Sequence, residues 1–84
     1  MKLSWIDDAW DDYLLWQKED KAIFSKINAL IKEIKRAPFE GIGKPELLKH
    51  ELAGVWSRRI TKEHRLLYRV LSDEIEIIEC KGHY

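Results

Sequence analysis

The chain has 84 residues, of which 45% are hydrophobic and 36% charged, and its formal net charge is zero. This composition suits a single globular domain over residues 1–84 and argues against disorder. Cys80 is the only cysteine, which excludes an internal disulfide. No apolar run approaches the roughly 18 residues of a membrane span, and no signal peptide is recognisable. We therefore expect a cytoplasmic protein.

The first half of the chain predicts one short strand and two helices. Residues 3–6 are typical of a strand, and Asp7 and Asp8 suit the start of a helix, because acidic side chains favour the positive end of the helix dipole. A second helix is expected between Asp20, a candidate N-cap, and Pro38. Its apolar side chains recur at helical spacing and form one stripe: Ile23, Ile27, Leu30, Ile31 and Ile34.

A long connection rich in glycine and proline follows, over residues 38–50. Connections of this length in compact domains are usually either functional or disordered. The apolar pair Leu47-Leu48 argues against disorder, so we expect this loop, which contains Glu46, to have a function.

Three strands are predicted in the remainder of the chain, at residues 55–60, 65–70 and 75–80. Residues 61–64 and 72–74 are short connections, which predict an antiparallel meander. The last strand is partly apolar on both faces, as expected inside a sheet. The order predicts an α+β fold with a short N-terminal strand, two helices packed on one face of an antiparallel sheet, and a three-stranded C-terminal meander.

Charge is unevenly distributed despite the neutral total. Residues 44–69 hold seven basic and three acidic side chains. Local positive potential attracts phosphate, although a solvated strand face would give the same pattern. Alternation along the first strand of the meander places Trp56, Arg58 and Ile60 on one face and Val55, Ser57 and Arg59 on the other.

Four side chains together suit the cleavage of RNA by its own 2′-hydroxyl. The reaction needs a base for the hydroxyl proton, positive charge at the phosphorus, and an acid for the departing 5′-oxygen. Glu46, Arg65 and His83 offer these groups, with the phenol of Tyr84 beside them, although each alone has an ordinary surface interpretation. No Cys or His lies at metal-ligand spacing, and no cofactor motif is recognisable, so neither a metal nor a cofactor is expected.

Several segments resemble the YoeB-type toxins of the RelE/ParE superfamily of toxin–antitoxin systems. They are the run from Pro38 to Lys49 (PFEGIGKPELLK), the run GVWSRRI at residues 54–60, and EHRLLY at residues 63–68. The spacing of Trp5, Trp10 and Tyr13 and the terminal His83-Tyr84 also match. The resemblance extends over essentially the whole chain.

The resemblance implies a metal-independent, ribosome-dependent endoribonuclease that cuts mRNA in the ribosomal A site and so inhibits translation. The implied roles are general base for Glu46, general acid for His83, phosphate stabilisation for Arg65, shaping of the site for Tyr84, and RNA contact for Lys49 and Arg59. The implied partners are a cognate YefM-type antitoxin, the 70S ribosome with mRNA, and a second copy of the chain. Gly82 departs from the family, where a bulkier residue is expected, and predicts a flexible approach to His83.

Two alternatives remain open. One is a non-enzymatic toxin of the same fold that binds and poisons another target, such as gyrase. The other is a ribonuclease that does not need the ribosome. The neutral net charge favours ribosome dependence, because it provides little general affinity for RNA.

Overall fold

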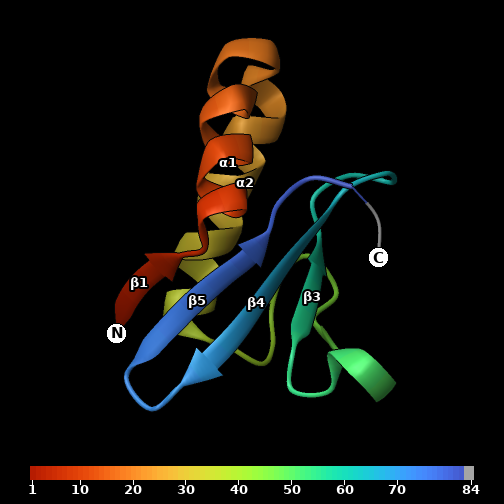
Figure 1. Ribbon diagram of the computed structural model, residues 1–84. Coiled ribbons are helices and arrows are strands. Elements are labelled where there is room, and N and C mark those ends of the chain that lie inside the picture. The colour runs from red at the N-terminus through yellow and green to blue at the C-terminus, as the bar shows by residue number, and fades with distance from the viewer. Residues whose placement is uncertain (83–84) are drawn as a thin grey trace.

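The computed structural model describes residues 1–82, so the candidates His83 and Tyr84 lie outside the described residues. The helices and strands follow one another along the chain (Figure 1) as β1 (Lys2–Trp5), α1 (Asp7–Glu19), α2 (Lys21–Arg36), β2 (Glu46–Leu47), the 3-10 helix η1 (His50–Leu52), β3 (Trp56–Arg59), β4 (Arg65–Leu71) and β5 (Glu74–Glu79). Among the helices of residues 1–82, none is both long enough and apolar enough to cross a membrane.

The five strands of residues 1–82 form one mixed sheet in the order β1-β5-β4-β3-β2. The expected α+β class and the C-terminal meander are confirmed, and β5 lies inside the sheet between β1 and β4. The sheet differs from the antiparallel expectation at one edge, where β1 runs parallel to β5. A parallel neighbour needs a long connection, and both helices lie between these two strands in sequence.

The predicted loop contains a strand that the sequence did not reveal. Glu46 of β2 pairs with Ser57, and Leu47 pairs with Trp56. Two exposed residues after a proline have too little alternation to predict a strand. The pairing depends on β3, which offers its edge to them, so only the tertiary structure defines β2.

The two helices follow the sequence closely. Asp20 ends α1 and caps α2, and its carboxylate accepts hydrogen bonds from the backbone N–H groups of Ala22 and Ile23, both at 3.1 Å. Both helices pack on one face of the sheet (Figure 1), as expected. The core on this face includes Trp16, Ile27, Leu30 and Ile34 from the helices and Leu66, Tyr68, Ile75 and Ile77 from the strands.

Among residues 1–82, the opposite face of the sheet, which we call the open face, carries a small apolar cluster. Leu48, Val55 and Leu67 are buried there, and Ile78 packs against them. The pairing of β4 and β5 shifts register beside Leu67, which gives β5 an extra residue at Ile78. The rest of the open face is available for a functional site.

Candidate functional site

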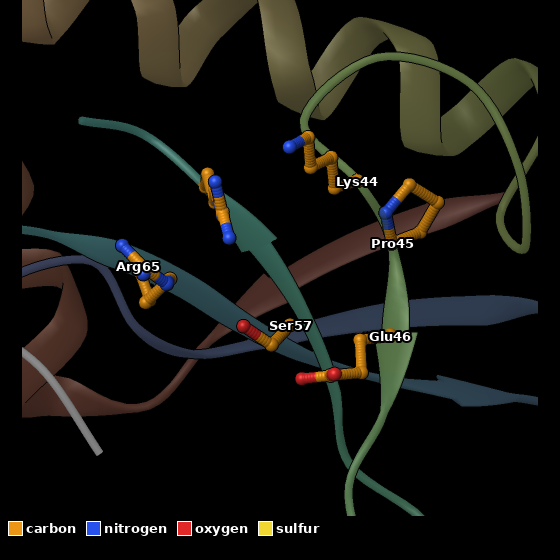
Figure 2. A pocket seen from close by; sticks show the side chains of 6 residues that line it. Lys44, Pro45, Glu46, Ser57 and Arg65 are labelled. Atoms are coloured by element: carbon orange, nitrogen blue, oxygen red, sulfur yellow. The ribbon is translucent and has the colours of Figure 1, made fainter. Parts of the chain in front are cut away.

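Three of the predicted site residues line one hollow. Glu46 from β2, Arg59 from β3 and Arg65 from β4 enclose a space of about 280 Å³, together with Lys44, Pro45 and Ser57. Figure 2 shows the Glu46 carboxylate extending towards Ser57, with Arg65 further along the neighbouring strand.

Strand register brings these residues together. Glu46 pairs with Ser57, Ser57 pairs with Leu67, and Arg59 pairs with Arg65, so all five side chains share the open face. Strands lie roughly 4.8 Å apart and rise about 3.4 Å per residue, which puts the Cα atoms of Glu46 and Arg65 roughly 12 Å apart. The two long side chains can therefore reach opposite sides of a group the size of a phosphate.

The lining of the hollow is mainly cationic. Lys44, Arg59 and Arg65 contribute positive charge, and Glu46 contributes the carboxylate. Ser57, only 3% exposed, adds a hydroxyl between them. The sequence placed Ser57 on the same face as Arg59 but gave no reason to single it out. Such a lining suits a phosphodiester, because guanidinium groups bind phosphate oxygens in a forked geometry.

The guanidinium of Arg65 is held from behind by the β3–β4 turn. Its Nη1 donates to the carbonyl of Thr61 at 2.9 Å and to those of Lys62 and His64, both at 3.3 Å. The Thr61 hydroxyl accepts from the N–H groups of Glu63 and His64, which explains a turn without glycine or asparagine. Arg65 is therefore preorganised, with little side-chain entropy left to lose on binding.

Lys49 lies apart from the other cationic candidates. With Glu46, Leu47 and Leu48, it lines a second hollow of about 290 Å³. Glu46 is the residue that borders both hollows, and it links the one lined by Lys49 to the one lined by the two arginines.

A sharp reversal brings the loop onto the sheet just before Glu46. Gly43 and Lys44 both have positive φ, 84° and 52°. The carbonyl of Gly43 accepts a 2.7 Å hydrogen bond from the N–H of Arg59. Backbone in the left-handed region is costly for a residue with a side chain, so Lys44 is held in place by this surrounding contact.

Arg58 does not belong to the cationic surface. It is fully buried, and its guanidinium donates to the Tyr68 hydroxyl and to three loop carbonyls. The acceptors are Tyr68 Oη (3.0 Å), Ile42 O (3.0 Å), Ala37 O (2.7 Å) and Glu40 O (2.8 Å). Ala37 is the C-cap of α2, where the helix dipole favours a cation. Arg58 therefore attaches the loop that leads to Glu46 to the core.

The chain beyond β5 turns towards the β3–β4 turn (Figure 1). Gly82 was expected to be flexible, but both of its backbone polar groups are hydrogen-bonded. Its N–H donates to Nδ1 of His64 at 2.9 Å, and its carbonyl accepts from the N–H of Arg65 at 3.0 Å. Its φ of 91° is a conformation that glycine adopts without strain. His83 and Tyr84, outside the described residues, follow directly from this anchored position.

His64 is a residue that the sequence did not single out. It is half-buried, and its ring packs edge-on against Trp16. Its place in the segment EHRLLY, directly before Arg65, was the signal for it in the sequence. Within residues 1–82, no group of three or more His, Cys, Asp or Glu side chains is arranged to hold a metal ion.

A small α+β domain with two helices on one face of a mixed sheet, and a cationic hollow on the other, has the fold of the RelE/ParE-type toxins. The chain matches the family described as YoeB-like toxin of bacterial type II toxin–antitoxin system over residues 5–84, and it belongs to that family. The resemblance found in the sequence is thus confirmed.

Relatives match the chain over its full length. "Toxin YoeB" of Escherichia coli strain K12 is 61% identical, with 100% of both chains covered. A structure described as a YoeB/ParE toxin from Agrobacterium tumefaciens is 53% identical, with a TM-score of 0.98 and 100% of both chains covered. A YoeB dimer from Staphylococcus aureus is 47% identical, with a TM-score of 0.93 and 100% of this chain and 98% of that chain covered.

Proposed function

We propose that this toxin is a metal-independent endoribonuclease that cuts mRNA in the ribosomal A site and thereby inhibits translation. The observation that carries the proposal is the hollow that Glu46, Arg59 and Arg65 line together. It combines a carboxylate with two guanidinium groups at a spacing that can accommodate a phosphodiester. Membership of a toxin family supports a damaging activity of this kind.

The reaction uses the RNA's own nucleophile. Glu46 takes the proton of the 2′-hydroxyl while the 2′-oxygen forms its bond to phosphorus. Arg65 stabilises the charge that accumulates on the phosphate oxygens. The bond to the 5′-oxygen then breaks, and this oxygen receives a proton. The products are a 2′,3′-cyclic phosphate, which can open to a 3′-phosphate, and a 5′-hydroxyl.

The proton donor in this proposal is His83, with Tyr84 shaping the site. Both lie beyond the described residues, and their roles rest on the resemblance to the family. The anchored Gly82 supports these roles, because its carbonyl accepts a hydrogen bond from the backbone N–H of Arg65, a residue that lines the hollow. Arg59 and Lys49 contact the RNA on either side of Glu46.

Ribosome dependence is supported by the charge of the chain. A net charge of zero gives little general attraction for RNA, so binding must come from a few local contacts. The ribosome supplies the positioning that a weak intrinsic affinity cannot, and alignment of the reacting groups contributes greatly to rate.

We also propose that the toxin assembles with a YefM-type antitoxin and forms a homodimer. The support is a heterotetrameric YoeB-YefM toxin–antitoxin complex and a YoeB dimer, both from Staphylococcus aureus and 47% identical to this chain. Light scattering of the free toxin, and of toxin purified with the antitoxin encoded beside it, should give the masses of a dimer and of a larger complex. A monomeric free toxin would contradict the homodimer.

The activity is tested by primer extension on mRNA translated in a reconstituted system. Wild-type toxin should give cuts in register with codons, and the new ends should be 2′,3′-cyclic or 3′-phosphate and 5′-hydroxyl. Glu46→Gln and Arg65→Gln should each lower the single-turnover rate by about 10² to 10³. Glu46→Gln should leave the melting temperature nearly unchanged, since Glu46 is exposed. Arg65→Gln should lower it by about 4 to 8 °C, because the guanidinium is half-buried and donates to carbonyls of the β3–β4 turn.

Other outcomes identify other functions. DNA damage without codon-linked cuts would indicate a gyrase poison, and equal cleavage of naked RNA would indicate a ribosome-independent ribonuclease. EDTA-sensitive cleavage that leaves 5′-phosphate ends would rule out attack by the 2′-hydroxyl.

A further inference from the structure

Gly82 is held at two points by two consecutive residues of the β3–β4 hairpin. Its N–H donates to Nδ1 of His64 at 2.9 Å, and its carbonyl accepts from the N–H of Arg65 at 3.0 Å. The segment after β5 is therefore attached to the same short stretch of chain that presents the Arg65 guanidinium to the hollow.

In the first of these bonds His64 is the acceptor. A backbone N–H can only donate, so the bond needs an acceptor atom at the position of Nδ1. A serine, lysine or phenylalanine at this position could not place a comparable acceptor there. The contact is therefore specific to a side chain with an acceptor two bonds from Cβ.

Trp16 fixes the orientation of the imidazole. The two rings meet edge-on, with centroids 4.8 Å apart and an interplanar angle of 72°. The indole N–H of this buried tryptophan donates to the carbonyl of Cys80 at 2.9 Å. The same side chain thus holds the imidazole in place and fixes the chain two residues before Gly82, and the Lys81 ammonium lies 5.7 Å from its ring.

We propose that His64 is a positioning residue, which holds Gly82 and so fixes the backbone from which the chain continues to His83 and Tyr84. The proposal rests on the proposed function, in which His83 is the general acid. Only one peptide bond separates Gly82 from His83, so an anchored Gly82 restricts the volume open to the acid. His64 acts through the backbone of Gly82 and does not itself contact the RNA.

Two substitutions separate the acceptor from the ring. His64→Phe keeps an aromatic ring against Trp16 but has no acceptor. His64→Asn loses the ring but places Oδ1 where Nδ1 lies. We expect His64→Phe to lower the single-turnover cleavage rate about 10- to 100-fold, as loss of a supporting contact typically does. The substrate concentration at half-maximal rate should stay the same, and His64→Asn should restore the rate to within about threefold of wild type, since only the acceptor is needed.

The hydrogen bond from Gly82 to His64 can also be tested without a cleavage assay. Hydrogen exchange of the Gly82 amide, followed by NMR, should be at least about tenfold faster in His64→Phe than in wild type or His64→Asn, because the opening equilibrium of that bond shifts. His50→Asn is the control, because His50 is exposed and its φ of 58° is tolerated by asparagine. It should change neither measurement. His64→Leu, a second variant without an acceptor, repeats the test should His64→Phe fail to fold.

Different results would contradict the positioning role, the anchoring of Gly82 and the proposed function. Unchanged cleavage in a folded acceptor-free variant, or equal loss in the Phe and Asn variants, would overturn the positioning role. A wild-type Gly82 amide that exchanges as fast as an unprotected one would overturn the anchor itself. Wild-type toxin that does not cut translated mRNA would instead refute the proposed function, while the exchange data would still decide whether His64 holds Gly82.

Discussion

Arg58 and Arg59 are adjacent in β3 and carry the same side chain, but they point to opposite faces of the sheet. Arg59 is exposed beside the hollow, whereas Arg58 is buried and donates to Tyr68 and to the carbonyls of Ala37, Glu40 and Ile42. Desolvation raises the pKa of the Tyr68 phenol, although the bond from Arg58 opposes this effect. Tyr68 therefore stays protonated and donates to the carbonyl of Pro38 at 2.7 Å.

The two arginines provide a matched pair of substitutions. Arg58→Gln removes donors from buried carbonyls and should lower the free energy of unfolding by about 3 kcal/mol. Arg59→Gln should change it by less than about 0.5 kcal/mol, as exposed substitutions do. Urea denaturation followed by circular dichroism measures both. Similar losses in the two variants would show that Arg58 does not anchor the loop.

The sequence predicted only part of the difference in burial between these two arginines. Alternation put Arg58 on the face of Trp56 and Ile60, which is the helix-covered face, and this was a signal for a buried arginine. Charge counting nevertheless placed it in the basic zone. Its carbonyl partners come from a loop whose path depends on the complete fold, so no local pattern could have identified them.

The loop before β2 depends on a close backbone approach at Gly43. A Cβ atom there would lie 2.8 Å from Leu30 Cδ2, 3.2 Å from Arg58 Cβ and 3.3 Å from the carbonyl oxygen of Arg59. Leu30 is fully buried, so it has little room to move. At Gly54, which also has positive φ, no atom lies within 4 Å of such a Cβ.

Alanine substitutions at the two glycines distinguish the cost of a strained backbone from the cost of a steric clash. Gly54→Ala should cost about 1 kcal/mol from its left-handed backbone alone. Gly43→Ala adds overpacking, and the total should be about 3 kcal/mol. It should also slow cleavage, since Lys44, Pro45 and Glu46 would move with the loop. Thermal unfolding and the cleavage assay test both effects, and equal costs at the two glycines would contradict the crowding.

The end of β5 carries a thiol that is well protected from reaction. Cys80 is fully buried, and its Sγ lies 3.4 Å from the carbonyl oxygen of Ala9. Burial raises the pKa of this thiol from its ordinary value of 9.0 to about 12, with smaller contributions from the carboxylates of Asp12 and Glu79. The reactive thiolate is therefore scarce at neutral pH.

Alkylation of Cys80 should therefore report opening of the last strand. At pH 8, iodoacetamide should react at least about 10³ times more slowly with the folded chain than with the chain in urea, from the shift in ionisation alone. Stability should also fall as the pH rises from 9.0 towards about 12, because the unfolded chain loses this proton first. Rapid alkylation under native conditions would show that the end of β5 opens readily.

At the scale of the whole molecule, periodic segments were predictable and tertiary pairings were not. The stripe of α2, the cap at Asp20 and the three strands of the meander followed from spacing alone. The parallel pairing of β1, the short strand β2 and the anchored Gly82 involve residues far apart in sequence. Glu46, Arg59 and Arg65 could be named as candidates from the sequence. Their common hollow could not be predicted, because it depends on the register of three strands.

The distribution of charge over the whole molecule predicts how RNA binding responds to salt. The net charge is zero, but the catalytic hollow carries Lys44, Arg59 and Arg65 against Glu46 alone. Each phosphate neutralised on a single strand contributes about −0.7 to the slope of log K against log salt concentration, so four contacts, from these three cations and Lys49, give about −3. Naked RNA should therefore bind weakly and with this shallow slope.

Two arginines on the open face test whether the salt slope follows the number of phosphate contacts. Arg59→Gln should make the slope shallower by about 0.7, because one phosphate contact is lost. Arg69 lies on the same face of β4, but it is paired with Glu76 at 2.9 Å, so Arg69→Gln should leave the slope unchanged. Fluorescence anisotropy with a short labelled RNA across a salt series measures all three proteins. A slope near −5, or equal effects of the two substitutions, would mean that RNA is bound by a wider surface than the hollow, and a chain with such a surface would have little need of the ribosome to hold its substrate.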